Sequence, residues 1–199
     1  MADAFAEAQA LLRDGRITEA KARLENLLAA EPHHGGSLHM LGLVALQDGA
    51  PEQAVTLMRQ AAQIDADVPA LHANLGFALL ACDRPEDAAA SFTSALTLNP
   101  TLDPARQGLA DVSNMLAARA LAAGDAPAAL TWVRQSLAAT QTPVARHLFA
   151  AVVPLLARVQ TDAAFRVALT RALNENWGPP IPCRPWRRRW RGAVICTTL

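Results

Sequence analysis

The sequence predicts an all-α protein in which repeated pairs of helices stack into an α-α superhelix. Three observations support this fold class. The chain is 52% hydrophobic but only 5% aromatic, and it is rich in alanine, which loses no side-chain entropy in a helix. Few segments carry the β-branched residues that favour strands. The segment LGLVALQDGAPEQAV at 41–55 is echoed 34 residues later by LGFALLACDRPEDAA at 75–89.

A fixed period of 34 residues predicts three repeat units over 1–34, 35–68 and 69–102. One pair of helices cannot bury all of its apolar residues, so neighbouring units must stack. In the first unit Ala8, Gly15, Ala20, Leu24 and Pro32 fit the same frame. The matched positions of the next two units are Leu41 with Leu75, Gly42 with Gly76, Ala54 with Ala88, Met58 with Phe92, and Ala61 with Ala95.

Each unit is predicted to contain two helices joined by a tight turn. In the third unit the first helix is expected over 70–81, and Pro85 begins a second helix that ends near Leu98. Proline suits the first helical position because the missing N–H would have no partner there. Gly49, in the turn of the second unit, fits a left-handed helix C-cap.

Small residues are expected where the two helices of a unit approach each other. The frame predicts that Gly76 faces Ala88, with the same pairing for Gly42 with Ala54 and Ala8 with Ala20. Larger side chains at Leu75, Leu79 and Phe92 would fill the space around that contact.

A degenerate fourth unit is predicted over 103–143. Asp103 and Pro104 form a helix start, and the next breaker is Gly124, which predicts one helix over about 104–123. Setting Gly124 at the turn shifts the frame by seven residues. The shifted frame places Leu116, Ala117, Ala129, Val133 and Ser136 at the packing positions.

Residues 144–177 are predicted to cap the open end of the stack. One helix is expected over 143–159, with a kink or an early end at Pro154. Another is expected over 162–176, where apolar residues recur at helical spacing.

The segment 178–199 differs from the rest because it holds four prolines in 177–185, five arginines and no acid. It could be a basic-aromatic patch for phosphates, bases or a membrane interface, a disordered end, or the product of a shifted reading frame. Composition favours a disordered tail or a shifted frame over a binding site.

The repeat resembles the tetratricopeptide repeat, a 34-residue helix–turn–helix unit. In the third unit His72 stands at the family's usual Trp position and Leu79 at its usual Tyr. The other matching residues are Leu75, Gly76, Ala88, Phe92, Ala95 and Pro100. The sequence of about 30–178 also resembles the repeat arms of bacterial proteins in which tetratricopeptide repeats are joined to a glycosyltransferase or methyltransferase domain.

The resemblance implies a concave groove lined by the first helix of each unit, which would bind a peptide or helix of a partner protein. Only Arg13 could contribute to the cationic clamp by which some members hold a C-terminal carboxylate. The groove candidates can equally pack against other helices of the chain, including those of 143–177. They are His39, Met40, Leu43, Gln47, Asn74, Phe77, Asn114 and Met115.

The function we predict is a non-catalytic protein-binding scaffold; the alternative is a truncated or separately encoded recognition arm of a glycosyltransferase or methyltransferase. No metalloprotease, dinucleotide, phosphate-loop or nucleophile-elbow motif is present, and no cofactor or metal is expected. His33 and His34 are expected to be exposed linker residues. Asp83, Glu86 and Asp87 are expected to favour a helix start rather than to act as an acid/base pair.

Charge and composition bear on the compartment and the partners. Residues 1–177 hold 13 basic and 18 acidic residues, and this mildly acidic balance argues against a nucleic-acid partner. Three scattered cysteines favour reduced thiols. The first residues lack a basic leader, and the longest apolar run of ten residues is too short for a membrane span. A cytoplasmic protein is the expectation.

Overall fold

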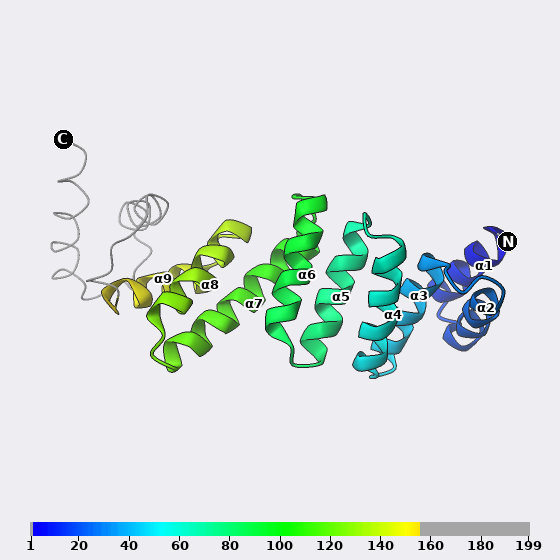
Figure 1. The fold of residues 1–199 in the computed structure, drawn as a ribbon, viewed down its shortest axis with the longest axis horizontal. Helices are drawn as coiled ribbons and strands as arrows, with labels where there is room; N and C mark the ends of the chain where they lie inside the picture. The colour runs from blue at the N-terminus through cyan, green and yellow to red at the C-terminus, as the bar shows by residue number, and fades with distance from the viewer. Residues whose placement is uncertain (1, 156–199) are drawn as a thin grey trace. The chain divides into compact units, whose positions relative to one another are not determined.

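The computed structural model describes residues 2–155, which form nine α-helices and no strand (Figure 1). This confirms the all-α prediction. The helices are α1 (Ala2–Arg13), α2 (Ile17–Ala30), α3 (Gly35–Gln47), α4 (Pro51–Ile64), α5 (Pro69–Ala81), α6 (Pro85–Leu98), α7 (Asp103–Ala122), α8 (Ala126–Ala139) and α9 (Pro143–Leu155).

The chain divides into two compact units, Met1–Leu109 and Ala110–Leu199, with the boundary inside α7. In the first unit α1 packs on α2, α3 on α4 and α5 on α6 (Figure 1). The pairs also stack, because α2 contacts α3 and α4 contacts α5. In the second unit α8 packs against α9. Of the predicted helix over 143–159, residues up to Leu155 are helical. Its remainder, the predicted helix over 162–176 and the tail 178–199 lie outside the described residues.

The turns inside the helix pairs show the 34-residue period directly in the backbone. Gly15, Gly49 and Asp83 have positive φ angles of 75°, 75° and 52°. The N–H of the residue that follows each of them donates back to the helix: Arg16 donates to Leu11 O at 2.9 Å, Ala50 to Ala45 O at 2.8 Å and Arg84 to Leu79 O at 2.9 Å. This is the Schellman end of a helix. The left-handed cap predicted at Gly49 is confirmed.

The fourth turn confirms the predicted shift of the frame. Gly124 has φ of 76°, and Asp125 N donates to Ala120 O at 2.9 Å. Gly124 follows Asp83 by 41 residues rather than 34, so α7 is two turns longer than α5. The predicted packing residues of this frame, Leu116, Ala117, Ala129, Val133 and Ser136, are all buried.

Replacing Gly49 with alanine is expected to lower the free energy of unfolding by about 1 kcal/mol. An L-residue in the left-handed region costs roughly 1–2 kcal/mol, and the stiffer unfolded chain offsets part of this. A Cβ atom on Gly49 has nothing within 4 Å, so only the backbone angle is tested. Urea unfolding measures the loss; Gly49→Asn, which tolerates this region better, should lose less. Equal stability of the alanine variant and the parent would contradict the assigned turn.

The centre of the third helix pair is the ring of Phe92, which is fully buried on α6. A Cβ atom on Gly76 of α5 would lie 2.7 Å from Cε1 of Phe92, and one on Gly108 of α7 would lie 2.5 Å from its Cζ. Both distances are shorter than van der Waals contact, so the ring occupies space that the two glycines leave open. The side chain nearest to Gly76 is therefore that of Phe92, one of the larger side chains expected around the contact of Gly76 with Ala88.

The second helix pair uses the same arrangement with a thinner side chain. A Cβ atom on Gly42 would lie 2.8 Å from Cγ of Met58 and 3.4 Å from the carbonyl oxygen of Ala54. Ala54 does lie near Gly42, as predicted, but Met58, at the position of Phe92, makes the closer contact.

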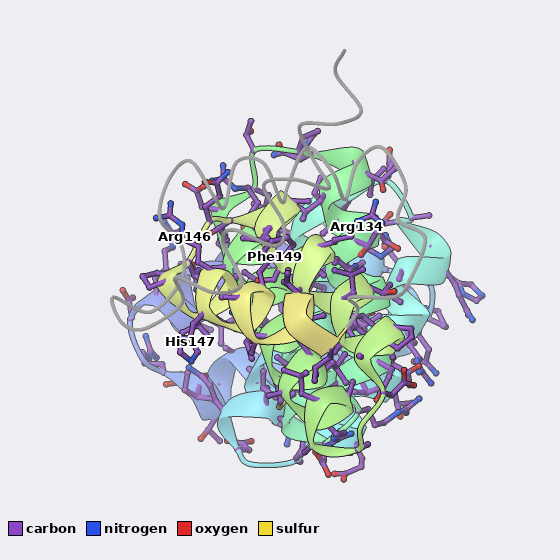
Figure 2. All side chains as sticks on the ribbon, turned by 90° about the vertical axis from the view of Figure 1, so that its left-hand side faces the viewer. Arg134, Arg146, His147 and Phe149 are labelled. Atoms are coloured by element: carbon purple, nitrogen blue, oxygen red, sulfur yellow. The ribbon has the colours of Figure 1, made fainter. Side chains whose placement is uncertain are left out.

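In the second unit the core lies between α8, α9 and the last turns of α7. Phe149 of α9, labelled in Figure 2, is buried in a cluster of apolar residues. His147, two residues earlier, is exposed on α9, as predicted. The other buried members of the cluster are Ala117, Ala126, Ala129, Val133, Val152 and Val153.

Candidate functional site

The candidate groove face consists of side chains on α1, α3 and α5, the first helices of the three pairs. They recur at the 34-residue period: Gln9, Leu43 and Phe77 share one position, and Leu12, Leu46 and Leu80 share another. Most are half-buried, and Phe77 is 37% exposed. Neither α3 nor α5 contains an Asp, Glu, Lys or Arg residue. The face is therefore largely apolar and uncharged over two successive repeats.

An open pocket of about 460 Å³ lies on this face between α1 and α3. A neighbouring pocket of about 400 Å³ shares Leu12, Arg13 and Met40 with it. Pockets that hold small ligands or anchoring side chains have volumes of this order. The lining of the larger pocket is Leu12, Arg13, Ile17, Met40, Leu43, Val44, Leu46 and Gln47.

Three of the predicted groove residues, Met40, Leu43 and Gln47, thus line one pocket. Arg13 supplies the only charge in the lining, and its Nε donates a long hydrogen bond of 3.4 Å to Gln9 O of its own helix. Ile17 was not predicted. It begins α2, so a rule that counts only first helices misses it.

His39 and Asn74 form a polar bridge between neighbouring repeats on the same face. The Nδ2 atom of Asn74 on α5 lies 2.8 Å from Nε2 of His39 on α3. Since an amide nitrogen can only donate, His39 accepts through Nε2 and carries its proton on Nδ1. Burial lowers the pKa of His39 below its ordinary value of 6.5, because the charged ring would lose solvation.

The lowered pKa of His39 predicts that unfolding becomes easier as the solution is acidified. Between the folded and the unfolded pKa the unfolded chain binds more protons, so stability is full above pH 6.5 and falls as pH drops toward the folded value. One histidine can contribute a slope of at most about 1.4 kcal/mol per pH unit. The midpoints of urea unfolding at several pH values between 5 and 8 measure this slope. His39→Gln should show a shallower slope than the parent; identical slopes would contradict this role.

Phe77 contributes to both the groove face and the core. Its ring meets that of Phe92 edge-on, with centroids 4.9 Å apart and planes at 71°. The favourable edge-to-face geometry holds the exposed part of Phe77 in a fixed position. A substitution at Phe77 therefore changes packing as well as the surface.

The two groove candidates of the fourth repeat lie in the second unit, and they differ from each other. Met115 is 42% exposed, whereas Asn114 is only 8% exposed. The Asn114 Oδ1 atom accepts from Ser136 Oγ at 2.8 Å, and its Nδ2 donates to Thr142 Oγ1 at 3.4 Å. Thr142 in turn accepts from Ala145 N at the start of α9. The Asn114 amide thus ties α7 to α8 and to the cap of α9.

The histidines near the first repeat junction also have structural partners. The Nδ1 atom of His34 accepts from Ser37 N at 3.0 Å and so caps α3. The prediction of an exposed linker residue holds for His33 but is wrong for His34. The imidazole of His34 is the N-cap acceptor of α3, a role that Ser or Asp more often has. His72, on α5, donates from Nε2 to Ala66 O at 2.8 Å.

Among residues 2–155, no group of three or more His, Cys, Asp or Glu residues could hold a metal ion. Cys82 has a free thiol in this part of the chain, and desolvation raises its pKa, which makes it a poorer nucleophile at neutral pH. No helix in the same range is long and apolar enough to cross a bilayer.

Comparison with protein families matches two models described as tetratricopeptide repeat. One covers residues 5–69, and the other covers 69–92 and 112–135. Together the matched segments make up more than half of the chain. The chain belongs to the tetratricopeptide repeat family. The second model resumes at 112, inside the long α7, so its two segments begin 43 residues apart rather than 34.

Solved structures show the same tetratricopeptide fold. A mutant of the O-GlcNAc transferase of Thermobaculum terrenum is 29% identical, with a TM-score of 0.56 over 67% of this chain and 25% of that protein. A MamA structure is 17% identical, with a TM-score of 0.57 over 87% of this chain and 92% of that one. Another MamA structure is 16% identical, with a TM-score of 0.52 over 85% and 94%. The comparison with curated proteins gives no match.

The chain thus spans about a quarter of the transferase that it resembles. Tetratricopeptide repeats form scaffolds for protein–protein interaction, and the described part of this chain is a helical-repeat scaffold of that kind.

Proposed function

We propose that the chain is a non-catalytic scaffold that binds an extended peptide or a helix of a partner protein on the groove face of α1, α3 and α5. The observation that carries the proposal is the pocket between α1 and α3, whose apolar lining continues at the 34-residue period to the exposed Phe77. An apolar pocket that is continued by periodic apolar side chains, with isolated polar groups among them, suits a peptide whose apolar side chains recur along its length.

The chemistry of the lining supports a peptide guest. Met40, which is flexible and polarisable, can adapt to the shape of an apolar side chain. Between the pocket and Phe77 the His39–Asn74 bridge supplies hydrogen-bonding groups suited to a peptide backbone. Arg13 and Gln47, both exposed at the pocket, offer polar contacts at its rim.

The double variant Met40→Ala, Asn74→Ala is expected to lose partner proteins that the parent chain captures. Quantitative mass spectrometry of proteins held by the tagged chain measures this, and the loss should be at least about tenfold for a groove partner, or about 1.4 kcal/mol. The matched control is Gln53→Ala, Gln63→Ala, two exposed positions on α4. Unchanged capture of every partner by the groove variant would contradict the proposal.

A second candidate function rests on the 29% identity to the O-GlcNAc transferase structure. In that case the chain is the recognition arm of a glycosyltransferase or methyltransferase, either part of a longer protein or paired with a separate catalytic chain. The groove face would then hold the protein substrate. Transferase assays on this chain alone should be blank, and DNA sequence beyond codon 177 that encodes a catalytic domain in frame would favour this function.

A further inference from the structure

We infer that His39 is a positioning residue that determines which hydrogen-bonding group Asn74 presents to a guest, and that protonation of His39 reverses the choice. The inference rests on the proposed groove function, because it concerns what a guest meets there. A guest would meet the hydrogen-bond acceptor of the Asn74 side chain when His39 is neutral and its hydrogen-bond donors when His39 is charged.

The first step is the geometry of the bridge. Asn74 Nδ2 on α5 donates to His39 Nε2 on α3, in the neighbouring repeat, at 2.8 Å. Both side chains are half-buried, and in the described part of the chain the Asn74 Oδ1 atom has no hydrogen-bond partner. With the amide nitrogen fixed on His39, the carbonyl oxygen is the group left for a guest, and it can accept from a backbone N–H.

The second step is what a proton does to this pair. A charged imidazole donates from both nitrogens, so Nε2 and Nδ2 would become two donors facing each other. A half-turn of the Asn74 carboxamide places Oδ1 on the charged ring and restores the hydrogen bond. The NH₂ group then becomes the group left for a guest, and it suits a carbonyl instead of an N–H.

No nearby charge competes with this switch, since burial alone accounts for the shifted pKa of His39. On α5 the other titratable group is His72, which bonds to Ala66 O. On α1, Glu7 is paired with Arg23 of α2. The residue of α1 that corresponds to His39 in the 34-residue period is Phe5, and Arg13 lies about two helical turns beyond it. The remaining described charged side chains of α1, α2 and α4 are Glu19, Lys21, Glu25, Glu52 and Arg59, and none of them is a cause of the lowered pKa of His39.

The bridge itself can be measured without any guest. In protein labelled with ¹⁵N, a scalar coupling across the hydrogen bond should join Asn74 Nδ2 to His39 Nε2 at pH 7.5. The coupling should vanish on acidification with the same midpoint, below pH 6.5, at which the His39 ring titrates, and the Asn74 amide signals should shift together with it. Absence of the coupling at pH 7.5, or Asn74 signals that ignore the His39 titration, would overturn the inference.

Two variants separate positioning from a general structural effect. In His39→Gln the Asn74 amide signals should no longer titrate, whereas in the matched variant His72→Gln they should titrate as in the parent. A groove partner that binds through the Asn74 oxygen should lose about tenfold in affinity on acidification in the parent and not in His39→Gln, a factor consistent with leaving one polar group unpaired. Because the coupling is measured on the free chain, failure of the groove proposal and failure of this inference give different results.

Discussion

Replacing Phe92 with alanine is expected to lower the free energy of unfolding by about 3–5 kcal/mol, the usual range for removing a fully buried aromatic ring. Phe92 is 0% exposed, and its ring fills the space above two glycines, Gly76 and Gly108, neither of which has a side chain that could move into the cavity. The loss would be a large share of a typical total of roughly 5–15 kcal/mol.

Urea unfolding followed by the helical circular dichroism signal measures this loss. Phe92→Leu, which keeps most of the volume, should lose less than the alanine variant. Phe77→Ala, which removes the partly exposed ring at the edge of Phe92, should also lose less. A loss below about 1 kcal/mol in Phe92→Ala would mean that the ring does not form the centre of this repeat.

Replacing Gly76 with leucine is expected to cost at least about 1–3 kcal/mol, because overpacking forces side chains and backbone to shift. A Cβ atom alone would already lie 2.7–2.9 Å from three ring atoms of Phe92, and Gly108 of α7 also lies close to that ring. Thermal melting measures the effect. The control is Ala70→Leu on the exposed side of the same helix, which should change stability by less than about 0.5 kcal/mol. Equal melting of Gly76→Leu and the parent would contradict the helix pairing.

The helices and turns of residues 2–102 could be predicted from the sequence because their signals are local and repeat. Pro51, Pro69 and Pro85 each begin a helix, and a turn residue at 15, 49 and 83 has the positive φ angle that ends the helix before it. The same local logic found the shifted turn at Gly124, since α7 has no breaker before it. Helix starts at proline and helix ends at a positive φ angle depend on the local backbone alone, so they can be predicted without knowing which helices contact each other.

Contacts between side chains on different helices could not be predicted in the same way. The period shows that Gly76 and Ala88 are small, but it does not tell which side chain fills the gap, and the longer Phe92 does so. Asn114 matched a groove position by counting in the shifted frame, yet its amide bonds to Ser136 and Thr142. His39 and Asn74 were both candidates, but their hydrogen bond depends on the distance between α3 and α5, which no spacing along the chain gives.

The measurement that tests the central claim most directly is a double-mutant cycle on Gly76 and Phe92. In the third repeat the two helices pack closely because the large side chain of Phe92 on α6 occupies the space that Gly76 leaves on α5. Gly76→Ala should therefore destabilise the parent chain but cost distinctly less in the Phe92→Leu background, with an interaction energy of about 0.5–3 kcal/mol. Equal costs of Gly76→Ala in the two backgrounds would contradict it, because the two residues would then not be in contact.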